Sequence, residues 1–507
     1  MTNIASPVRS ILSSVLLLGT AFGAHAQEQD PSPPVEEAAG ALPGPAVPVQ
    51  GAVDVPTLTS SAASPEIDLS DTSGYDGSAA GSPDEVASDI GQSGMESGMG
   101  ESESSEPIID MSAPAELAES GWTQWLAPLR VSLIHELSYK FAAPTRIVNN
   151  RSSARVEYSK LLTEKVFFRL DTKLNLHWGN DHRANAKREN PFRELVTREA
   201  YLQTSLGETS LRVGYQILPW GVSEGGVITD EVSPRNSAEF FFVPLEESRI
   251  GQPMVTADYF GGSGQWTAFF VPRPSYNKYP DAGSEYDIPG AFDAPEPDGS
   301  WGDTDDFEYG LRWKQTFGKS DFSLMAASLI DNDYLIRKQR FRMFGFTANI
   351  ARDNLLYRAE VAWKQPKVFF AQPAVGSPLS IVESDQMDSS LGFDYSPGGR
   401  PLTYSAEVIW SRLLDWEGTI LGRKQDEYSL VGSISNRFFN NDLTLSWLSI
   451  YSKSYTSYQH KFLSSYLLDD NSTVYLELFY PDERDPRSST WPYRDQKQVV
   501  IRYQYQF

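Results

Sequence analysis

The final segment of the chain, residues 498–507, alternates between apolar and polar side chains along its length. Its apolar side consists of Val499, Ile501, Tyr503, Tyr505 and Phe507. Because successive side chains of a β-strand point to opposite faces, this pattern predicts a strand with one apolar and one hydrated face. Such a strand fits the wall of a barrel between lipid and water, but a soluble edge strand has the same alternation. The interpretation therefore depends on how often the pattern recurs upstream.

The same alternation recurs in short segments from Leu129 onward, for example in 168–178, 309–317 and 357–364, where charged side chains occupy one face. A soluble sandwich would turn that charged face outward, whereas a barrel turns it toward a wet lumen. We predict strands near the following ranges: 129–142, 151–162, 165–178, 193–205, 210–218, 253–260, 264–272, 306–318, 320–330, 339–351, 354–365, 385–396, 402–412, 426–438, 442–451, 457–468, 472–480 and 495–507.

The connections between these strands favour the barrel. Every second junction is a tight turn, such as Gly318-Lys319 and Asn440-Asn441. The junctions between the turns are mostly long, including 219–252, 273–305, 366–384 and 413–425. Short periplasmic turns that alternate with long external loops are typical of bacterial outer-membrane barrels. We therefore predict an all-β fold, a transmembrane antiparallel up-and-down β-barrel of about 18 strands, with roughly 16 as the alternative.

Aromatic residues fall where the predicted strands would meet the membrane interfaces. With this topology, Trp178, Trp363 and Trp410 lie at the outer ends of ascending strands. Phe317 and Phe438 close descending strands at their inner ends. Two aromatic belts of this kind flank the apolar band of outer-membrane barrels.

Residues 1–26 have the features of a secretory signal peptide. Arg9 precedes an apolar run, and Ala24-His25-Ala26 forms a small-x-small cleavage site. No later stretch approaches the roughly 18 consecutive apolar residues that a transmembrane helix requires, so membrane insertion would use strands. We therefore expect the protein in the outer membrane of a Gram-negative bacterium.

Residues 27–120 are rich in Pro, Ala, Ser, Gly and Glu and contain almost no aromatic residues. Such a segment buries too little apolar surface to offset its ordering entropy, so we predict disorder. Residues 27–129 contain 19 acidic side chains and no Lys or Arg, whereas 48 acids accompany 42 bases from Arg130 onward. The acidity therefore belongs to a periplasmic tail, and the chain lacks the basic face of nucleic-acid-binding proteins. We predict three regions: the signal peptide 1–26, the tail 27–120 and the barrel 121–507.

Charged residues on the predicted inner faces would line a water-filled channel, because a barrel of this size is wide enough for one. The candidates are Lys140, Arg169, Asp171, Lys173, Glu199, Arg212, Glu308, Arg312, Lys314, Arg358, Glu360 and Arg502. Acids and bases balance on these faces, so their number predicts no strong ion preference. They either pair across strands to keep the wall hydrated and stiff, or form a ladder for solutes.

The connection 219–252 combines charges with three consecutive phenylalanines, Phe240-Phe241-Phe242. Three adjacent phenylalanines are unfavourable in water, so we expect this loop to pack back into the barrel and narrow it. That placement would bring charged residues to a constriction: Asp230, Arg235, Glu246, Glu247 and Arg249. The alternatives are a lid over the mouth and a subunit contact. The connection 273–305, which contains Trp301, is a candidate second lid.

A resemblance to known families agrees with the channel interpretation. The runs 198–202 (Arg-Glu-Ala-Tyr-Leu), 210–216 (Ser-Leu-Arg-Val-Gly-Tyr-Gln) and 309–313 (Tyr-Gly-Leu-Arg-Trp) are similar to segments of porin-type outer-membrane families. Over roughly 190–330 the chain resembles alginate-export-like proteins and related uncharacterised porin-like families. The resemblance implies passive passage of polar solutes or polysaccharide across the outer membrane. We expect no cofactor. Alginate exporters have a strongly electropositive pore, from which the balanced lining departs. Phe507 resembles the signal that the barrel-assembly machinery reads.

An outer-membrane hydrolase is the enzymatic alternative. Barrel lipases need Ser, His and a polar third residue together, and the mature chain contains only His135, His177, His182 and His460. Nothing that resembles a nucleophile elbow or a paired histidine metal site surrounds them. The absence of Cys excludes thiolate chemistry and Cys-based zinc sites. We therefore expect neither an enzyme nor a metal site.

A scaffold is the second alternative. The barrel would then sheathe or anchor a periplasmic or secreted partner that docks through the acidic tail. A steady open conductance would favour the channel, and its absence would favour a plugged scaffold. No motif in the sequence identifies the solute.

Overall fold

The computed structural model describes residues 123–243, 245–288, 306–333, 338–373, 377, 380–398, 400–488 and 490–507. The predicted signal peptide, the predicted disordered tail and Trp301 lie outside these residues. None of the helices in the described ranges is long and apolar enough to cross a membrane.

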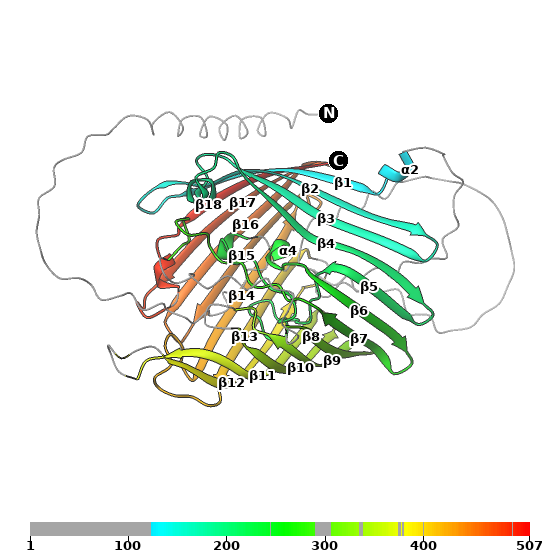
Figure 1. Cartoon of the computed structure of the whole chain (residues 1–507). Helices are drawn as coiled ribbons and strands as arrows, with labels where there is room; N and C mark the ends of the chain where they lie inside the picture. Colours follow the sequence, from blue (N-terminus) through cyan, green and yellow to red (C-terminus); the bar gives the residue numbers. More distant parts are fainter. Residues whose placement is uncertain are drawn as a thin grey trace, which may run out of the picture. The chain divides into compact units, whose positions relative to one another are not determined.

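The described residues form eighteen β-strands, which lie side by side in chain order (Figure 1). Their bounds are β1 Leu129–Lys140, β2 Arg146–Thr163, β3 Val166–His177, β4 Phe192–Leu206, β5 Thr209–Gln216, β6 Gln252–Gly261, β7 Gly264–Val271, β8 Glu308–Phe317, β9 Ser320–Ile330, β10 Arg340–Arg352, β11 Leu355–Ala371, β12 Ser380–Tyr395, β13 Leu402–Leu413, β14 Asp426–Phe438, β15 Leu443–Ser452, β16 Ser457–Asp469, β17 Ser472–Glu483 and β18 Gln498–Gln506. The helical elements in the same ranges are short: α2 Thr123–Leu126, α3 His182–Lys187, η1 Phe240–Phe242, α4 Leu245–Ser248 and η2 Trp491–Tyr493.

The sheet is closed. Every strand is antiparallel to its neighbours in the chain, and β1 also pairs with β18, from Ser132 opposite Gln506 to Lys140 opposite Gln498. Closure leaves no row of unpaired backbone groups at a sheet edge. The predicted all-β class, the antiparallel up-and-down order and the strand number of 18 are confirmed.

Side-chain alternation gives the wall two different faces. On β1, Ser132, Glu136 and Lys140 are buried inside the barrel, whereas the intervening Leu133 is 45% exposed on the outer surface. Exposed large apolar side chains recur on most of the other strands, for example Leu202 on β4, Leu311 on β8 and Leu391 on β12. Trp178, Trp363, Phe317 and Phe438, which the sequence assigns to interface belts, are exposed members of this outer face: their exposed fractions lie between 38% and 59%.

The prediction that residues 366–384 form a loop is wrong for most of these residues. β11 continues to Ala371 and β12 begins at Ser380, and these extensions pair with each other. Proline lacks the N–H that a strand interior requires, which is why the sequence suggests an end at Pro366. The structure places this proline at a register shift between Lys364 and Lys367, an irregularity of the ladder at which proline is tolerated.

A second irregularity changes one inner face. In the β3–β4 pair, Asp171 lies opposite Glu199 but Thr172 lies opposite Thr197, so β4 contains one extra residue, Arg198. A bulge of this kind turns an additional side chain toward the partner strand. Arg198 donates to the inner-face carboxylate of Asp171 at 2.7 Å.

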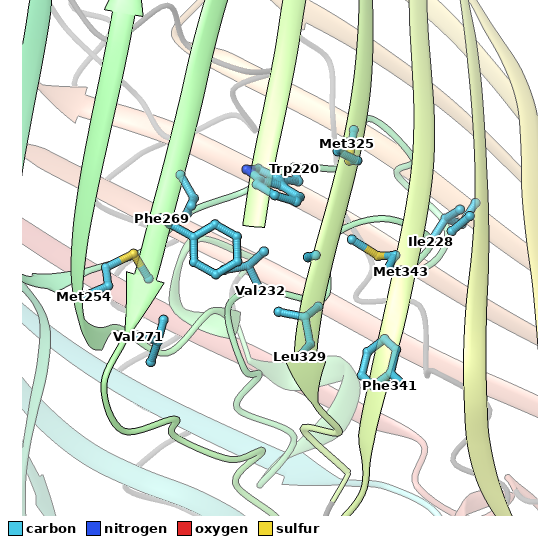
Figure 2. Packing of buried hydrophobic residues seen from close by; sticks show 13 residues of the cluster. Trp220, Ile228, Val232, Met254, Phe269, Val271, Met325, Leu329, Phe341 and Met343 are labelled. Carbon is cyan, nitrogen blue, oxygen red and sulfur yellow. The ribbon is translucent and has the colours of Figure 1, made fainter. Parts of the chain in front are cut away.

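The inner face is not polar throughout, which differs from the hydrated lining predicted. Strands β6, β7, β9 and β10 direct buried apolar side chains inward, and apolar residues that lie between β5 and β6 pack against them (Figure 2). The cluster contains Leu218, Trp220, Ile228, Val232, Met254, Phe269, Val271, Met325, Ala327, Leu329, Phe341, Met343 and Ala362. These strands therefore carry apolar side chains on both faces. The connection between β5 and β6 shields the inward-facing set from water.

Candidate functional site

The inner wall carries the charged residues that the sequence assigns to a pore lining. Eight are buried: Lys140, Asp171, Lys173, Arg212, Glu308, Arg312, Arg358 and Glu360. The other four are partly exposed: Arg169, Glu199, Lys314 and Arg502. Their position along a solute path stays a prediction.

Ion pairs between neighbouring strands occupy much of this lining. Arg212 pairs with Asp258 at 3.1 Å, and Arg169 pairs with Glu199 at 2.6 Å. Three further wall pairs join inner faces: Arg155–Asp171 at 2.9 Å, Arg502–Glu136 at 2.7 Å and Lys314–Asp321 at 3.9 Å. Paired charges of this kind hydrate the wall without giving it a strong net potential.

The 217–251 segment, which joins β5 to β6, adds carboxylates to this wall. Four of its glutamates each pair with a cation of a strand. The pairs are Glu224 with Arg358, Glu231 with Lys364 at 2.5 Å, Glu239 with Arg151 at 2.6 Å and Glu247 with Lys173 at 2.6 Å. Two of these cations belong to β11, one to β2 and one to β3.

Two inner-face carboxylates bind the backbone of the same segment. Glu360 on β11 accepts hydrogen bonds from the N–H groups of Val222, Ser223 and Thr229 at 2.6–2.7 Å and from the Thr229 hydroxyl at 2.6 Å. A buried carboxylate is stable only when such donors replace its water. Here the donors come from one segment and hold it against the wall.

Glu407 on β13, two strands away from β11, makes the same kind of contact. Its carboxylate accepts from the Ser223 hydroxyl at 2.6 Å and from the N–H groups of Glu224 and Gly225 at 3.0 Å each. Gly225 itself packs so closely on Val431 that a Cβ would lie 2.4 Å from a Val431 methyl carbon. Glu360 and Glu407 therefore bind the same end of the segment.

Three of the predicted constriction residues meet inside the segment. Asp230 pairs with Arg235 at 2.6 Å and with Arg249 at 2.9 Å, and it accepts from the Trp220 N–H at 3.1 Å. Burial raises the pKa of Asp230, but the Arg249 and Arg235 guanidinium groups outweigh it and lower the pKa below its ordinary value. The Asp230 cluster thus fixes the segment's own fold.

The other two predicted constriction residues do not join this cluster. Glu247 pairs with Lys173 of β3 instead. The side chain of Glu246 lies outside the described residues, although its backbone belongs to α4.

The three phenylalanines of the segment pack against aromatic residues from other elements. Phe241 stacks on Phe479 of β17 with ring centroids 4.7 Å apart. Phe240 contacts Tyr493 at 4.6 Å. The Lys461 ammonium on β16 donates to the carbonyl oxygen of Phe241 at 3.0 Å. This part of the segment therefore contacts the wall near β16 and β17.

The described part of the predicted second lid, residues 273–288, contacts the ends of β1, β2 and β18. Glu285 pairs with Lys140 at 3.1 Å and with Arg146. The Tyr286 hydroxyl donates to Gln498 at 3.2 Å. This connection therefore reaches across the closing seam of the barrel.

A pocket remains between the 217–251 segment and the β2–β4 wall. Four cations line it: Arg151, Lys173, Arg183 and Arg198. Three carboxylates line it as well: Glu194, Glu239 and Glu247. Of these seven, only Lys173 and Glu247 are among the predicted site residues. Strand alternation does not predict Arg198 as an inner residue, because the bulge shifts the alternation at this position. It does not predict Arg183 either, because this residue belongs to the short helix α3 and not to a strand.

Residues 140–466 match the model of a family described as "Protein of unknown function (DUF1302)". The search of curated protein sequences found no match.

Several solved structures are similar to this chain at low identity. OccAB1 of Acinetobacter baumannii is 10% identical with a TM-score of 0.48, over 76% of this chain and 97% of that chain. OccK8 (OprE) of Pseudomonas aeruginosa is 10% identical with a TM-score of 0.46, over 75% and 97%. OmpF of Salmonella typhi, solved with daunomycin, is 9% identical with a TM-score of 0.40, over 75% and 97%. Conclusions about solutes therefore rest on the geometry of this chain alone.

Proposed function

The chain belongs to the DUF1302 family of proteins of unknown function, and we propose that it is an outer-membrane channel for the passive passage of polar solutes or oligosaccharides. The observation that carries this proposal is a closed barrel with a largely apolar, exposed outer face and charges on its inner face. Within lipid every backbone polar group needs a partner, and a closed barrel supplies one for each strand.

The outer membrane is the membrane that this architecture fits. The leader sequence of residues 1–26 supports export, and the alternation of short turns with long connections supports an orientation with the short turns in the periplasm. Phe507 follows β18 directly and has an exposed aromatic ring, and its N–H donates to the Val131 carbonyl oxygen at 2.9 Å. An exposed terminal ring of this kind supports recognition by the barrel-assembly machinery.

We propose that the 217–251 segment crosses the lumen and narrows it. Its residues 222–231 bind β11 and β13, whereas Glu239 and Glu247 bind β2 and β3. In a ring of 18 strands, β2 and β11 are nine positions apart (11 minus 2), which is half of the ring. A segment held at two opposite walls divides the bore, and solutes pass beside it.

Planar-bilayer recording of the purified mature protein tests the channel directly. We expect steady single-channel conductance, and liposomes that contain the protein should swell in neutral sugars and in small ions of both signs, because the wall charges are paired. A protein that inserts without any conductance would instead be a plugged scaffold. The density of contacts that hold the 217–251 segment is the observation that favours this second function.

Acid is expected to raise the conductance. Burial alone would raise the pKa of Glu247, but the Lys173 ammonium outweighs it and lowers the pKa to about 2. A carboxylate whose pKa is lowered by folding stabilises the folded segment at any pH above its pKa in the unfolded chain, which is 4.5 for Glu247. That stabilisation is lost as the pH falls toward the pKa of the folded state. Recordings between pH 4.5 and pH 2 should therefore show the segment loosening and the current rising.

A single substitution separates this effect from general acid damage. Glu247→Gln removes the titrating group, so the variant should conduct more than the parent at pH 7 and change less on acidification. Glu208→Gln in the β4–β5 turn is the matched control. Its conductance should change with pH as that of the parent does. A parent conductance that is constant from pH 7 to pH 2 would contradict the prediction.

A further inference from the structure

The outer face of the barrel carries a row of aromatic side chains on the neighbouring strands β13–β17 (Figure 1). Trp410 stacks on Tyr428 with ring centroids 6.4 Å apart, and Tyr451 stacks on Tyr458 at 4.7 Å. Tyr480 follows on β17 and is 43% exposed. All five lie near the strand ends opposite to the β14–β15 and β16–β17 turns. Rings in such a row mark the level at which a barrel wall meets lipid headgroups.

Two lysines lie over rings of this row. The Lys453 ammonium is 5.5 Å from the centroid of the Tyr428 ring, and the Lys497 ammonium is 4.4 Å from that of the Tyr480 ring. The face of an aromatic ring attracts a cation, and a lysine stem extends along apolar surface while its charge stays in the polar layer. Within the described ranges neither ammonium pairs with a carboxylate. Both charges are therefore available to an anion at the headgroup level.

The other charges of this row compensate one another in part. Arg484 lies 4.8 Å from the Tyr458 ring centroid and pairs with Asp482 at 2.6 Å. Arg412 pairs with Asp426 at 3.5 Å. With these two pairs neutral, the row keeps the two positive charges of the lysines. Arg484 has an exposed guanidinium group with further N–H donors.

A polar pair lies one residue pair further into the apolar band of the outer face. Ser449 on β15 lies opposite His460 on β16, and its Oγ is 2.8 Å from the His460 Nδ1. The Trp447 Nε1–H donates to the same Oγ at 2.8 Å, which leaves the serine proton for Nδ1 and places the histidine proton on Nε2. In the described part of the chain Nε2 of His460 has no hydrogen-bond partner. A donor that faces lipid requires an acceptor from the lipid itself.

The spacing of the lysines indicates the size of the anion. Lys453 follows β15 and Lys497 precedes β18, so three strand spacings separate them, which is roughly 14 Å. A headgroup with one phosphodiester reaches only one of them. Two phosphates at opposite ends of a disaccharide reach both, and Arg484, which follows β17, lies between them.

From these observations we propose that the outer face of β14–β18 is a binding site for a bisphosphorylated disaccharide lipid of the lipid A type. The two phosphates bind Lys453 and Lys497, and a carbonyl oxygen that links an acyl chain to the headgroup accepts from Nε2–H of His460. The inference rests on the proposed place of the barrel in an outer membrane, but the binding itself is measurable without any current.

Native mass spectrometry of the full-length mature protein, released from detergent, tests the binding with three lipids. The probes are bisphosphorylated lipid A, monophosphoryl lipid A with the same acyl chains, and phosphatidylethanolamine, which has no net charge. Monophosphoryl lipid A should bind about fivefold more weakly than lipid A, because one lysine loses its partner. Phosphatidylethanolamine should bind at least about tenfold more weakly. Inorganic phosphate should not displace lipid A, because it lacks the acyl linkage and the second phosphate.

Substitutions locate the site. The double variant Lys453→Gln and Lys497→Gln should bind lipid A at least about tenfold more weakly than the parent and should no longer distinguish it from monophosphoryl lipid A. Lys165→Gln with Lys319→Gln is the matched control: it removes the same charge in the β2–β3 and β8–β9 turns at the other end of the barrel and should bind as the parent does. Heat-modifiable migration in gels reports that each variant is folded.

A third variant tests the acyl linkage separately. His460→Phe keeps an aromatic ring on the outer face but removes the Nε2–H donor. Since all three lipids carry acyl carbonyls, their binding should weaken by a similar factor, and the preference for two phosphates should remain. A preference that disappears in His460→Phe would contradict the assigned roles.

The outcomes separate the lipid site from the channel. Lipid A that binds no better than phosphatidylethanolamine, or a lysine double variant that binds as the parent does, would overturn the site. Displacement of lipid A by inorganic phosphate would show a site for free anions and would also overturn it. Conductance without a preference for lipid A would leave the channel standing. A preference for lipid A that the lysine double variant loses, in a protein without conductance, would support the site and overturn the channel.

Discussion

Replacing residues 237–247 by two glycines is expected to raise the single-channel conductance at least about twofold, because it removes the part of the proposed obstruction that contacts β2, β3 and β17. The ends of the excision already lie together. The Asn236 N–H donates to the Ser248 carbonyl oxygen at 2.6 Å, and Arg235 pairs with Arg249 as a backbone bridge. A two-residue linker therefore closes the gap without strain on the rest of the segment.

The excision removes defined contacts and spares others. It eliminates the Glu239–Arg151 and Glu247–Lys173 pairs and the stacking of Phe241 on Phe479. The end of the segment that Glu360 and Glu407 bind stays in place. Larger solutes should then pass as well, which liposome swelling with sugars of increasing size measures.

A milder variant serves as the comparison. The double substitution Glu239→Gln and Glu247→Gln keeps the chain length and the aromatic contacts but removes two ionic attachments, so its conductance should lie between the parent and the excision. If the excised protein folds and conducts as the parent does, the segment does not narrow the path and the proposal for it fails.

The second large effect concerns the packing of Trp220, whose surroundings are called the Trp220 seat below. This side chain is fully buried against β7 and β9, and its ring lies 5.1 Å from that of Phe269 in an edge-to-face arrangement (Figure 2). Trp220→Ala should destabilise the folded protein by about 3–5 kcal/mol, the usual cost of removing a buried tryptophan. Urea titration of the protein in detergent, followed by heat-modifiable migration, measures the loss.

Gly310 on β8 is the complementary half of this seat. A Cβ at Gly310 would lie 2.5 Å from Phe269, 2.9 Å from Ala327 and 2.9 Å from Trp220, all closer than contact allows. Gly310→Ala should therefore cost about 1–3 kcal/mol through overpacking. Since Trp220→Ala removes one of the three clashing groups, the double variant should lose less than the sum of the single losses, by about 0.5 kcal/mol or more.

Another strand glycine provides the control. Gly432 has only one neighbouring atom near the position of a Cβ, the Ser405 carbonyl oxygen at 3.9 Å. Gly432→Ala should leave the stability almost unchanged. Equal losses at Gly310 and Gly432 would show that the Trp220 seat has no special contribution.

The barrel itself was predictable from sequence, because alternation and turn spacing are local signals. On β1, Ser132, Glu136, Ser138 and Lys140 are polar and buried at even spacings, so most of the pattern is visible without knowledge of the partners. The register shifts at Arg198 and at Pro366 were not predictable, because a bulge inserts a residue without changing the composition of its strand. The sequence also does not predict the apolar inner faces of β7 and β9. A strand that is apolar on both sides gives no sign of which side faces lipid and which side a loop covers.

The candidate site was predictable only in part. Glu247, Lys173 and Glu360 are visible as charges on a loop and on alternating strands. Their partners are not, because the strands that bind the 217–251 segment are distant in the chain. Glu239 illustrates the difference: its role depends on Arg151, 88 residues earlier, and on Asn149.

The distant partners of the 217–251 segment have a consequence for biogenesis. Thr229 binds a residue 131 positions later in the chain, Ser223 one 184 positions later and Phe241 one 220 positions later. Contacts so remote in sequence form late, because long stretches of chain must be ordered before they can close. The wall is therefore assembled before this segment settles, and if the segment narrows the lumen as proposed, a newly inserted barrel passes through a stage in which its permeability barrier is still incomplete.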